Sequence, residues 1–341
     1  MGFDLTAGYG TSSIAFNNGT IVDVVQRQQG TGYNDMLARM SREEAQHPTP
    51  PYYNCSAIRE DVWRQWNRWW RRTCGLPSSD DVWALGSLLQ QLKTDTNVWL
   101  RERQMDDMQV VFVTVPMLPA IYMEDLVDAT ALVGLQIITL PWGVHGGAYR
   151  EHVPVTEINT AFAGMGLGLE GIFPTKNETY MWSRNILSVL FTNKALMAQL
   201  SPIGRASSFI AMDGIANFSL GLEAMDAMGN ETYWQAVRSA LNGILDLDAH
   251  SRFSLGGSEL GRVIVHGEAA ENDIFRGILR EEVEAAQRSD EEEKRPQFWS
   301  VNPVFAGSRG AAIFANWCQR GLGSGFFWTF PNLKPDGPPW F

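Results

Sequence analysis

Hydrophobic and polar positions at the start of the chain follow the pattern of a β-hairpin. The apolar residues of Phe3–Leu5 indicate the end of a buried strand, and Ile14–Phe16 indicates a second strand. Between them, Thr6–Ser13 is small, hydroxylated and contains glycine, which predicts a tight polar turn. Such a turn presents N–H groups and hydroxyls that can hold a phosphate, although an ordinary hairpin turn explains the same pattern. Ile21–Gln26 then predicts a third strand, and Arg27–Pro51 has the composition of a loop.

Two long stretches with helical spacing follow. The basic segment Arg59–Arg72 carries tryptophans at i, i+3 and i+7, namely Trp63, Trp66 and Trp70. Because such a stripe usually packs on a core, we expect the tryptophans inside and the arginines outside, rather than a binding platform. Ser78–Asp80 predicts the cap of a second, longer helix.

The middle of the chain has the spacing of a strand–helix–strand unit. Met108–Val115 and Leu135–Leu140 are apolar runs of strand length, and Ala120–Val133 between them has helical spacing. Strands joined by a helix pair in parallel. The Gly-rich segment that follows contains His145 and His152 without a third nearby ligand, so we predict no metal site.

The second half of the chain alternates between helices and short strands. Helices are expected at Thr156–Leu169, Asn177–Leu200, Thr232–Leu247, Asn272–Gln287 and Val304–Arg320. Strands are expected at Ser208–Met212 and Arg262–Val265, with Phe218–Glu223 as the hairpin partner of the first.

Composition limits the partners and the compartment. The 341 residues are 45% hydrophobic, enough for one large domain or two lobes with their own cores. A net charge of -11 argues against a nucleic-acid or anionic-membrane partner. Three cysteines without a CxxC pair, no signal-peptide pattern and no apolar run of transmembrane length favour the reducing cytoplasm.

Several short motifs follow one another in a recognisable order. They are the Asp4 turn, VTVP at Val113–Pro116, GLQII at Gly134–Ile138, Glu-x-x-Thr-Ala at Glu157–Ala161, Asp213-Gly214, His266-Gly267-Glu268, and Arg-Gly-Ala-Ala at Arg309–Ala312. This order resembles the nucleotide-binding domain of Hsp70, within the actin/hexokinase/Hsp70 superfamily, and most of all the divergent Hsp70-type proteins of filamentous fungi.

The resemblance implies a fold and a division of the chain. The fold would be a two-lobed α/β protein, the actin/Hsp70-like ATPase fold with ribonuclease-H-like sheets, and with trimmed upper lobes. Lobe I would comprise residues 1–170 and resume at 303–341. Lobe II would comprise 171–302 and contain an inserted helical segment at 171–207.

The chain departs from the family where the family holds ATP. The Thr pair that contacts phosphate is reduced to Thr6, with Thr11 as a partial substitute. Ile215 and Ala216 replace two glycines of the second phosphate loop. Their Cβ atoms would crowd a phosphate. Glu268 adds a negative charge nearby. Asp4 and Glu157 remain as counterparts of magnesium-water ligands, but we expect no working ATPase and no cofactor.

Two functions are compatible with such a scaffold. The first is a cofactor-free enzyme that binds a hydrophobic, terpenoid-like intermediate and promotes an intramolecular cyclisation such as a Diels–Alder reaction. The resemblance extends to proteins of fungal natural-product pathways, including Diels–Alderases of the sordaricin norbornene-synthase type. The second is an inactive pseudo-ATPase that serves as a nucleotide- or protein-binding module. Both leave open a homo-oligomer.

For the enzyme, the ancestral cleft supplies the candidate residues. A cycloaddition needs its reactive conformer held in place and a hydrogen-bond donor on an activating carbonyl. The candidate catalytic donors are Tyr9, Thr11 and His266. The candidate substrate-binding residues are Thr6, Asp213, Ile215, Asn217, Phe218 and Glu268. No metal takes part, and the inserted segment is an alternative location for the pocket.

Overall fold

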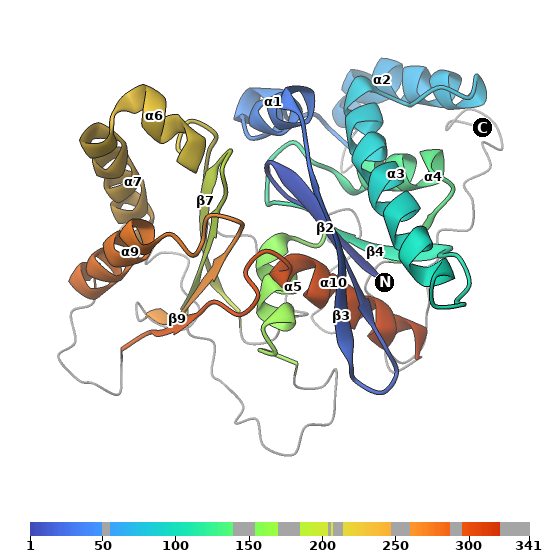
Figure 1. Ribbon diagram of the computed structural model, residues 1–341. Helices are drawn as coiled ribbons and strands as arrows, with labels where there is room; N and C mark the ends of the chain where they lie inside the picture. Colours follow the sequence, from blue (N-terminus) through green and yellow to red (C-terminus); the bar gives the residue numbers. More distant parts are fainter. Residues whose placement is uncertain are drawn as a thin grey trace. The chain divides into compact units, whose positions relative to one another are not determined.

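The computed structural model describes residues 1–49, 55–138, 154–169, 185–203, 206, 214–246, 260–286 and 295–320. It is an α/β structure with two five-stranded mixed sheets (Figure 1). Contacts divide the chain into Met1–Thr156 with Ala311–Phe341, and Glu157–Gly310. Residues 157–169 and 303–310 therefore group with the second unit, whereas the sequence placed them in lobe I.

The first sheet has the strand order β3-β2-β1-β4-β5. Its strands are β1 (Gly2–Leu5), β2 (Tyr9–Ala15), β3 (Ile21–Gln28), β4 (Val110–Thr114) and β5 (Gln136–Ile137). β1, β2 and β3 are antiparallel neighbours, while β4 pairs in parallel with β1, and β5 with β4. The predicted opening hairpin and the parallel strand–helix–strand unit are confirmed. The hairpin turn is shorter than expected, because Tyr9 already lies in β2.

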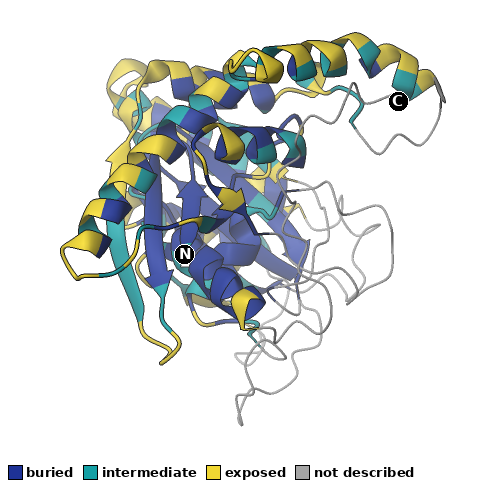
Figure 2. Cartoon of the chain, turned by 90° about the vertical axis from the view of Figure 1, so that its right-hand side faces the viewer, coloured by how far each residue is buried: buried dark blue, intermediate teal, exposed yellow. Residues whose placement is uncertain are grey.

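Helices cover both faces of this first sheet. The helices between β3 and β5 are α1 (Thr31–Met40), α2 (Cys55–Thr73), α3 (Asp80–Arg101) and α4 (Met123–Leu132). α3 packs on one face, where the Ser12 hydroxyl bonds the Thr96 hydroxyl at 2.9 Å. On the other face, Phe112 of β4 contacts Phe314 of α10 (Ala306–Gln319) with ring centroids 5.5 Å apart. Figure 2 shows buried strands beneath helices whose outer sides are exposed.

The second sheet repeats the connectivity of the first. Its strands are β6 (Asn185–Phe191), β7 (Leu196–Pro202), β8 (Gly214–Asn217), β9 (Leu260–His266) and β10 (Gln297–Trp299). Their order is β10-β9-β6-β7-β8, with β6, β7 and β8 antiparallel, and with β9 parallel to β6 and β10 parallel to β9. In each sheet, therefore, the first strand is central, the second and third lie antiparallel on one side, and the fourth and fifth lie parallel on the other.

Helices also cover both faces of the second sheet. α7 (Asn230–Leu245) and α9 (Asp273–Ala286) share a hydrophobic core with one face. On the other face, the Arg262 guanidinium lies 5.8 Å from the ring centroid of Phe162 on α5 (Glu157–Gly164). A Cβ atom on Gly164 would lie 2.0 Å from the Ala306 carbonyl oxygen, so only glycine allows α5 to approach the start of α10 this closely.

The secondary structure predicted from the sequence is wrong in three stretches of the described residues. The inserted helical segment at 171–207, and the helix expected from Asn177, contain strands β6 and β7 instead. β6 is central and buried on both faces, so its mostly apolar sequence carries no strand alternation. Phe218–Glu223 is a turn entering a 3-10 helix (Leu222–Ala224), followed by α6 (Met225–Met228), rather than a hairpin partner. The predicted loop Arg27–Pro51 contains α1, whose apolar face is buried.

Candidate functional site

A row of polar side chains crosses the first sheet at the expected site. Thr11 of β2, Asp4 of β1 and Thr114 of β4 are register partners, and all three are buried. They lie on the sheet face that carries Phe112, opposite the face that packs on α3. The hydroxyls of Thr6 and Thr11 have no hydrogen-bond partner among the described residues. Buried hydroxyls normally have one, so this row retains unused hydrogen-bonding capacity.

The loop between β1 and β2 is held from within the first unit. The Gly8 N–H donates to Asn34 Oδ1 of α1 at 2.8 Å, and the Gln29 N–H donates to the Gly8 carbonyl at 2.7 Å. Gly8 has a φ of 91°, which suits glycine. Tyr9, the first residue of β2, is fully buried. Thr6, Tyr9 and Thr11 are thus brought together on one hairpin.

In the corresponding loop of the second sheet, Thr192–Ala195, three backbone amides donate to side chains of the protein. The hydroxyl of Thr192 accepts from the N–H groups of Lys194 at 3.1 Å and Ala195 at 3.0 Å. The N–H of Asn193 donates to Glu268 Oε1 at 3.2 Å. Glu268, which the sequence placed near a phosphate, thus bonds the loop backbone instead. All three of these amides therefore donate to side chains of the protein.

His266 ends strand β9 and is buried. Its Nε2 lies 3.0 Å from the Ser188 hydroxyl of β6, and burial lowers its pKa to about 4. The imidazole is therefore neutral near pH 7 and already has a partner. This geometry favours a structural hydrogen bond between His266 and Ser188 over the predicted role of His266 as a donor to substrate.

The remaining predicted residues do not form a loop. Ile215 and Asn217 lie on β8, which β7 and β6 separate from β9 and His266. Ile215 packs against the core of the second unit, and Asn217 Oδ1 accepts from the Ser219 N–H at 2.8 Å. Phe218 is half-buried in the turn that follows, and Asp213 lies outside the described residues. The prediction that Ile215 crowds a phosphate loop is wrong, because Thr192–Ala195 forms the turn of the β6–β7 hairpin and Ile215 lies within β8.

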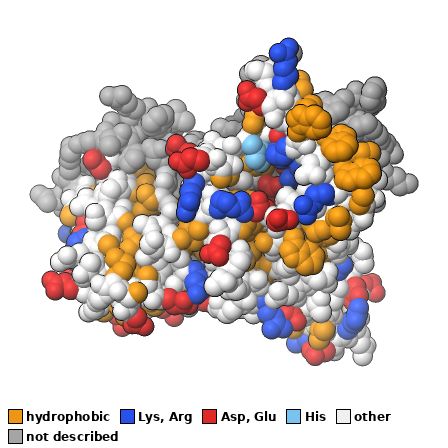
Figure 3. All heavy atoms as spheres, turned by 90° about the horizontal axis from the view of Figure 1, so that it is seen from above, with side chains coloured by type: hydrophobic (Ala, Val, Ile, Leu, Met, Phe, Trp, Pro, Cys, Tyr) orange, Lys and Arg blue, Asp and Glu red, His pale blue; other side chains and the backbone are white. Residues whose placement is uncertain are grey.

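Sequence reasoning assigned the faces of α2 the wrong way round. Trp63, Trp66 and Trp70 are 75%, 44% and 50% exposed, whereas Arg68 is only 5% exposed. Trp66 and Trp70 stack with centroids 6.1 Å apart and ring planes 4° apart. Figure 3 shows the hydrophobic band over α2, beside a group of arginine and carboxylate side chains.

The buried face of α2 is an ion-pair network with α4. Arg68 bonds Asp125 at 2.7 Å and Asp128 at 2.6 Å, and Arg64 pairs with Asp61 and Glu124. Burial alone would lower the pKa of the Arg68 guanidinium, but the carboxylates outweigh it and raise that pKa. The arginine face of such a helix can be predicted to be buried only if the acidic helix that packs against it is known.

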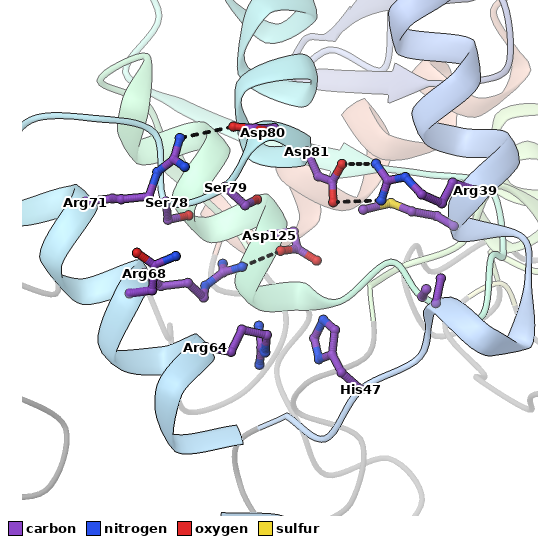
Figure 4. Close-up of a pocket in the computed structure, with 14 residues that line it drawn as sticks. Arg39, His47, Arg64, Arg68, Arg71, Ser78, Ser79, Asp80, Asp81 and Asp125 are labelled. Carbon is purple, nitrogen blue, oxygen red and sulfur yellow. Dashed lines mark hydrogen bonds and ion pairs between the residues drawn. The ribbon is translucent and has the colours of Figure 1, made fainter. Parts of the chain in front are cut away.

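A cavity of about 290 Å³ lies among the helices of the first unit (Figure 4). It is bounded by the end of α1, the polar face of α2, the start of α3 and the start of α4. Its lining includes the charged and hydroxyl side chains of Arg39, His47, Arg64, Arg68, Arg71, Ser78, Ser79, Asp80, Asp81 and Asp125. From the sequence, Ser78–Asp80 is predicted only as a helix cap.

The chain matches no protein-family model, and no curated protein sequence matches it. Within the described ranges, no helix is both long and apolar enough to cross a membrane. The same residues contain no group of three or more His, Cys, Asp or Glu side chains that is arranged to hold a metal ion.

Proposed function

We propose that the chain is a divergent member of the actin/Hsp70 superfamily. The repeated strand order supports this, because that superfamily is built from two sheets of the same connectivity, as the resemblance of the motifs implies. The ordered motifs VTVP and Glu-x-x-Thr-Ala fall at the end of β4 and at the start of α5, which is compatible with the resemblance.

On this scaffold, we infer that nucleotide is no longer the ligand. A phosphate cradle needs free backbone N–H groups at the hairpin loops. In both units a side chain already accepts from such a group, Asn34 from Gly8 and Thr192 and Glu268 from the second loop. A phosphate would have to displace these acceptors, and the Glu268 carboxylate would repel it.

The function supported best is a cofactor-free enzyme that acts on a hydrophobic, terpenoid-like intermediate and promotes its cyclisation. The single observation that carries this proposal is the pair of unused, buried hydroxyls of Thr6 and Thr11 beside Asp4. A hydroxyl in a water-poor site can donate to the carbonyl that activates a dienophile, and such a donor contributes about 2.7–4 kcal/mol of barrier lowering. Thr6 and Thr11 replace Tyr9 and His266 as the preferred donors.

The test is turnover of a polyunsaturated terpenoid aldehyde by purified protein, followed by chromatography of the cyclised product. Thr11→Val and Thr6→Val keep the side-chain shape and remove the donor, and we expect the rate to fall about 10²-fold or more for one of them. Thr130→Val is the matched control, because its buried hydroxyl already donates to the Leu126 carbonyl within α4. Undiminished rates in both hydroxyl variants contradict the assignment.

The exposed tryptophans of α2 favour a second candidate, a protein-binding module. Three large aromatic side chains on one helix face are costly to leave in water and are typical of contact surfaces. A second copy of this chain is the partner that can be tested directly, by sedimentation velocity. Association that Trp63→Ser and Trp70→Ser abolish supports this candidate, and a monomer at all concentrations excludes the homo-oligomer.

A further inference from the structure

The cavity of the first unit has the properties of a binding site separate from the hydroxyl row. Its volume of about 290 Å³ lies at the lower end of the range for small-molecule sites. It therefore suits a small metabolite rather than a nucleotide. Figure 4 shows the labelled side chains of four segments arranged around it.

Ser78 is the observation that points to a ligand. The residue is 3% exposed and lines the cavity, yet its hydroxyl has no hydrogen-bond partner in the described part of the chain. Buried polar groups are nearly always bonded, so an unbonded hydroxyl beside a cavity indicates that a bound group completes it. The ligand must offer an acceptor, a donor or both at this point.

The start of α3 adds donors beside Ser78. Ser79 caps this 22-residue helix, and its oxygen accepts from the Val82 N–H at 3.1 Å. Its own O–H remains able to donate. The positive end of the helix dipole also lies here, and helix N-termini of this kind favour phosphate groups.

The cavity lining contains both arginines and carboxylates. Arg39, Arg64, Arg68 and Arg71 lie beside three aspartates of the lining, and Arg64 is also paired with Asp61 and Glu124 next to the cavity. Arg68 is committed to buried carboxylates. Arg39 forms a two-bond pair with Asp81. By contrast, Arg71 Nη2 pairs at 3.1 Å with Asp80, whose side chain is 94% exposed, while Arg71 Nε donates to the Pro77 carbonyl at 2.7 Å. The exposed pair with Asp80 is weak, so the Nη groups of Arg71 are available to a ligand.

We propose that this cavity binds the phosphate group of a small phosphorylated metabolite. The phosphate accepts from the hydroxyls of Ser78 and Ser79 and from the guanidinium of Arg71. The exchange of Asp80 for phosphate as the partner of Arg71 breaks one exposed ion pair and forms a charge-assisted bond in a more enclosed site. This site does not depend on the proposed cyclisation.

Isothermal titration of the full chain tests the proposal, with orthophosphate and phenyl phosphate as probes and succinate as the carboxylate comparison. We expect both phosphates to bind with dissociation constants below about 1 mM, and succinate at least about tenfold more weakly. Ser78→Ala and Arg71→Met should each weaken phosphate binding about tenfold. Ser87→Ala is the matched control, since its hydroxyl donates to the Trp83 carbonyl on the outer part of α3, and its affinity should equal that of the wild type.

A thermal melt separates a ligand role for Ser78 from a structural one. Removing a buried hydroxyl without a partner should leave the melting temperature of the ligand-free protein unchanged or raise it by about 2 °C. A lower melting temperature for Ser78→Ala means that the hydroxyl serves the fold, and the proposal fails. It also fails if neither phosphate binds at about 10 mM, if succinate binds as tightly, or if Ser78→Ala binds phosphate like the wild type.

Discussion

Arg68 lies between α2 and α4 with its guanidinium bonded to two buried carboxylates. Removal of water from three charged groups is costly, and the mutual attraction of the charges offsets this cost only while all partners are present. Asp128 has a second partner in Arg72 at 2.8 Å, whereas Asp125 depends on Arg68 among the arginines of α2. Loss of Arg68 should therefore destabilise the folded protein more than loss of Arg72.

Arg68→Met should lower the free energy of unfolding by about 3 kcal/mol, because it leaves buried carboxylates without their cation. Urea denaturation followed by circular dichroism measures the change. Arg101→Met is the control, since Arg101 pairs with Asp107 at the surface and its loss should leave the denaturation midpoint unchanged. A small effect of Arg68→Met would mean that water enters the network.

The buried His266 predicts how stability depends on pH. Its folded pKa is lowered by burial from 6.5 to about 4, so the unfolded chain binds its proton first as the pH falls. Its stabilising contribution is thus complete above pH 6.5 and is lost as the pH falls towards 4. Between pH 7 and pH 5 the loss should be about 2 kcal/mol.

Urea denaturation at pH 7 and pH 5 measures this loss, and the comparison with His266→Gln isolates it. The variant has no imidazole to protonate, so its stability should fall less than that of the wild type over the same interval. Equal losses in the two proteins would show that His266 is accessible to protons in the folded state.

At the scale of single residues, the sequence could indicate which residue types form the candidate site, but not which neighbours surround them. The hydroxylated opening turn makes Thr11 a candidate donor and Thr6 a candidate substrate-binding residue, and the register with Asp4 places Thr11 in a buried polar row. Tyr9 is as buried as the two threonines, but of these three side chains only the threonine hydroxyls lack a partner among the described residues. The bond between His266 and Ser188 depends on a neighbour far away in the chain. Ser78 resembled an ordinary cap residue for the same reason.

At the scale of elements, α2 shows how far periodicity can mislead. Its spacing of tryptophans predicted a helix correctly, and the helix extends over Cys55–Thr73. The orientation was wrong because an arginine-rich face is normally solvated, whereas here Glu124, Asp125 and Asp128 of α4 accept it. The strands β6 and β7 were missed because a buried, mostly apolar segment of this length fits a helix equally well.

The exposed face of α2 should contribute little to the fold. Trp66→Ser should change the free energy of unfolding by about 0.5 kcal/mol or less, because the side chain is half in water in the folded protein. Trp234→Ala provides the contrast, since Trp234 of α7 belongs to the second core and its loss should cost about 3 kcal/mol. A large effect of Trp66→Ser, measured by urea denaturation, would mean that this face is covered.

At the scale of the whole molecule, the repeated sheet is the feature that the sequence predicted least directly. The ordered motifs implied two related lobes, but the second hairpin was assigned to Asp213 instead of Thr192–Ala195. The two hairpins share connectivity without sharing sequence, since one turn contains Gly8 and the other contains Asn193 and Lys194. Sheet pairing over long sequence separations cannot be read from local patterns.

The central proposal is that this chain does not bind nucleotide, because side chains accept from the Gly8 amide of the first hairpin loop and from three amides of the second. Isothermal titration with ATP and magnesium tests it most directly, with the Ser78→Ala variant run in parallel so that phosphate binding in the cavity is recognised. We predict no saturable binding to that variant at about 1 mM ATP. Micromolar affinity in the same variant, together with ATP hydrolysis that Asp4→Ala abolishes, would contradict the claim.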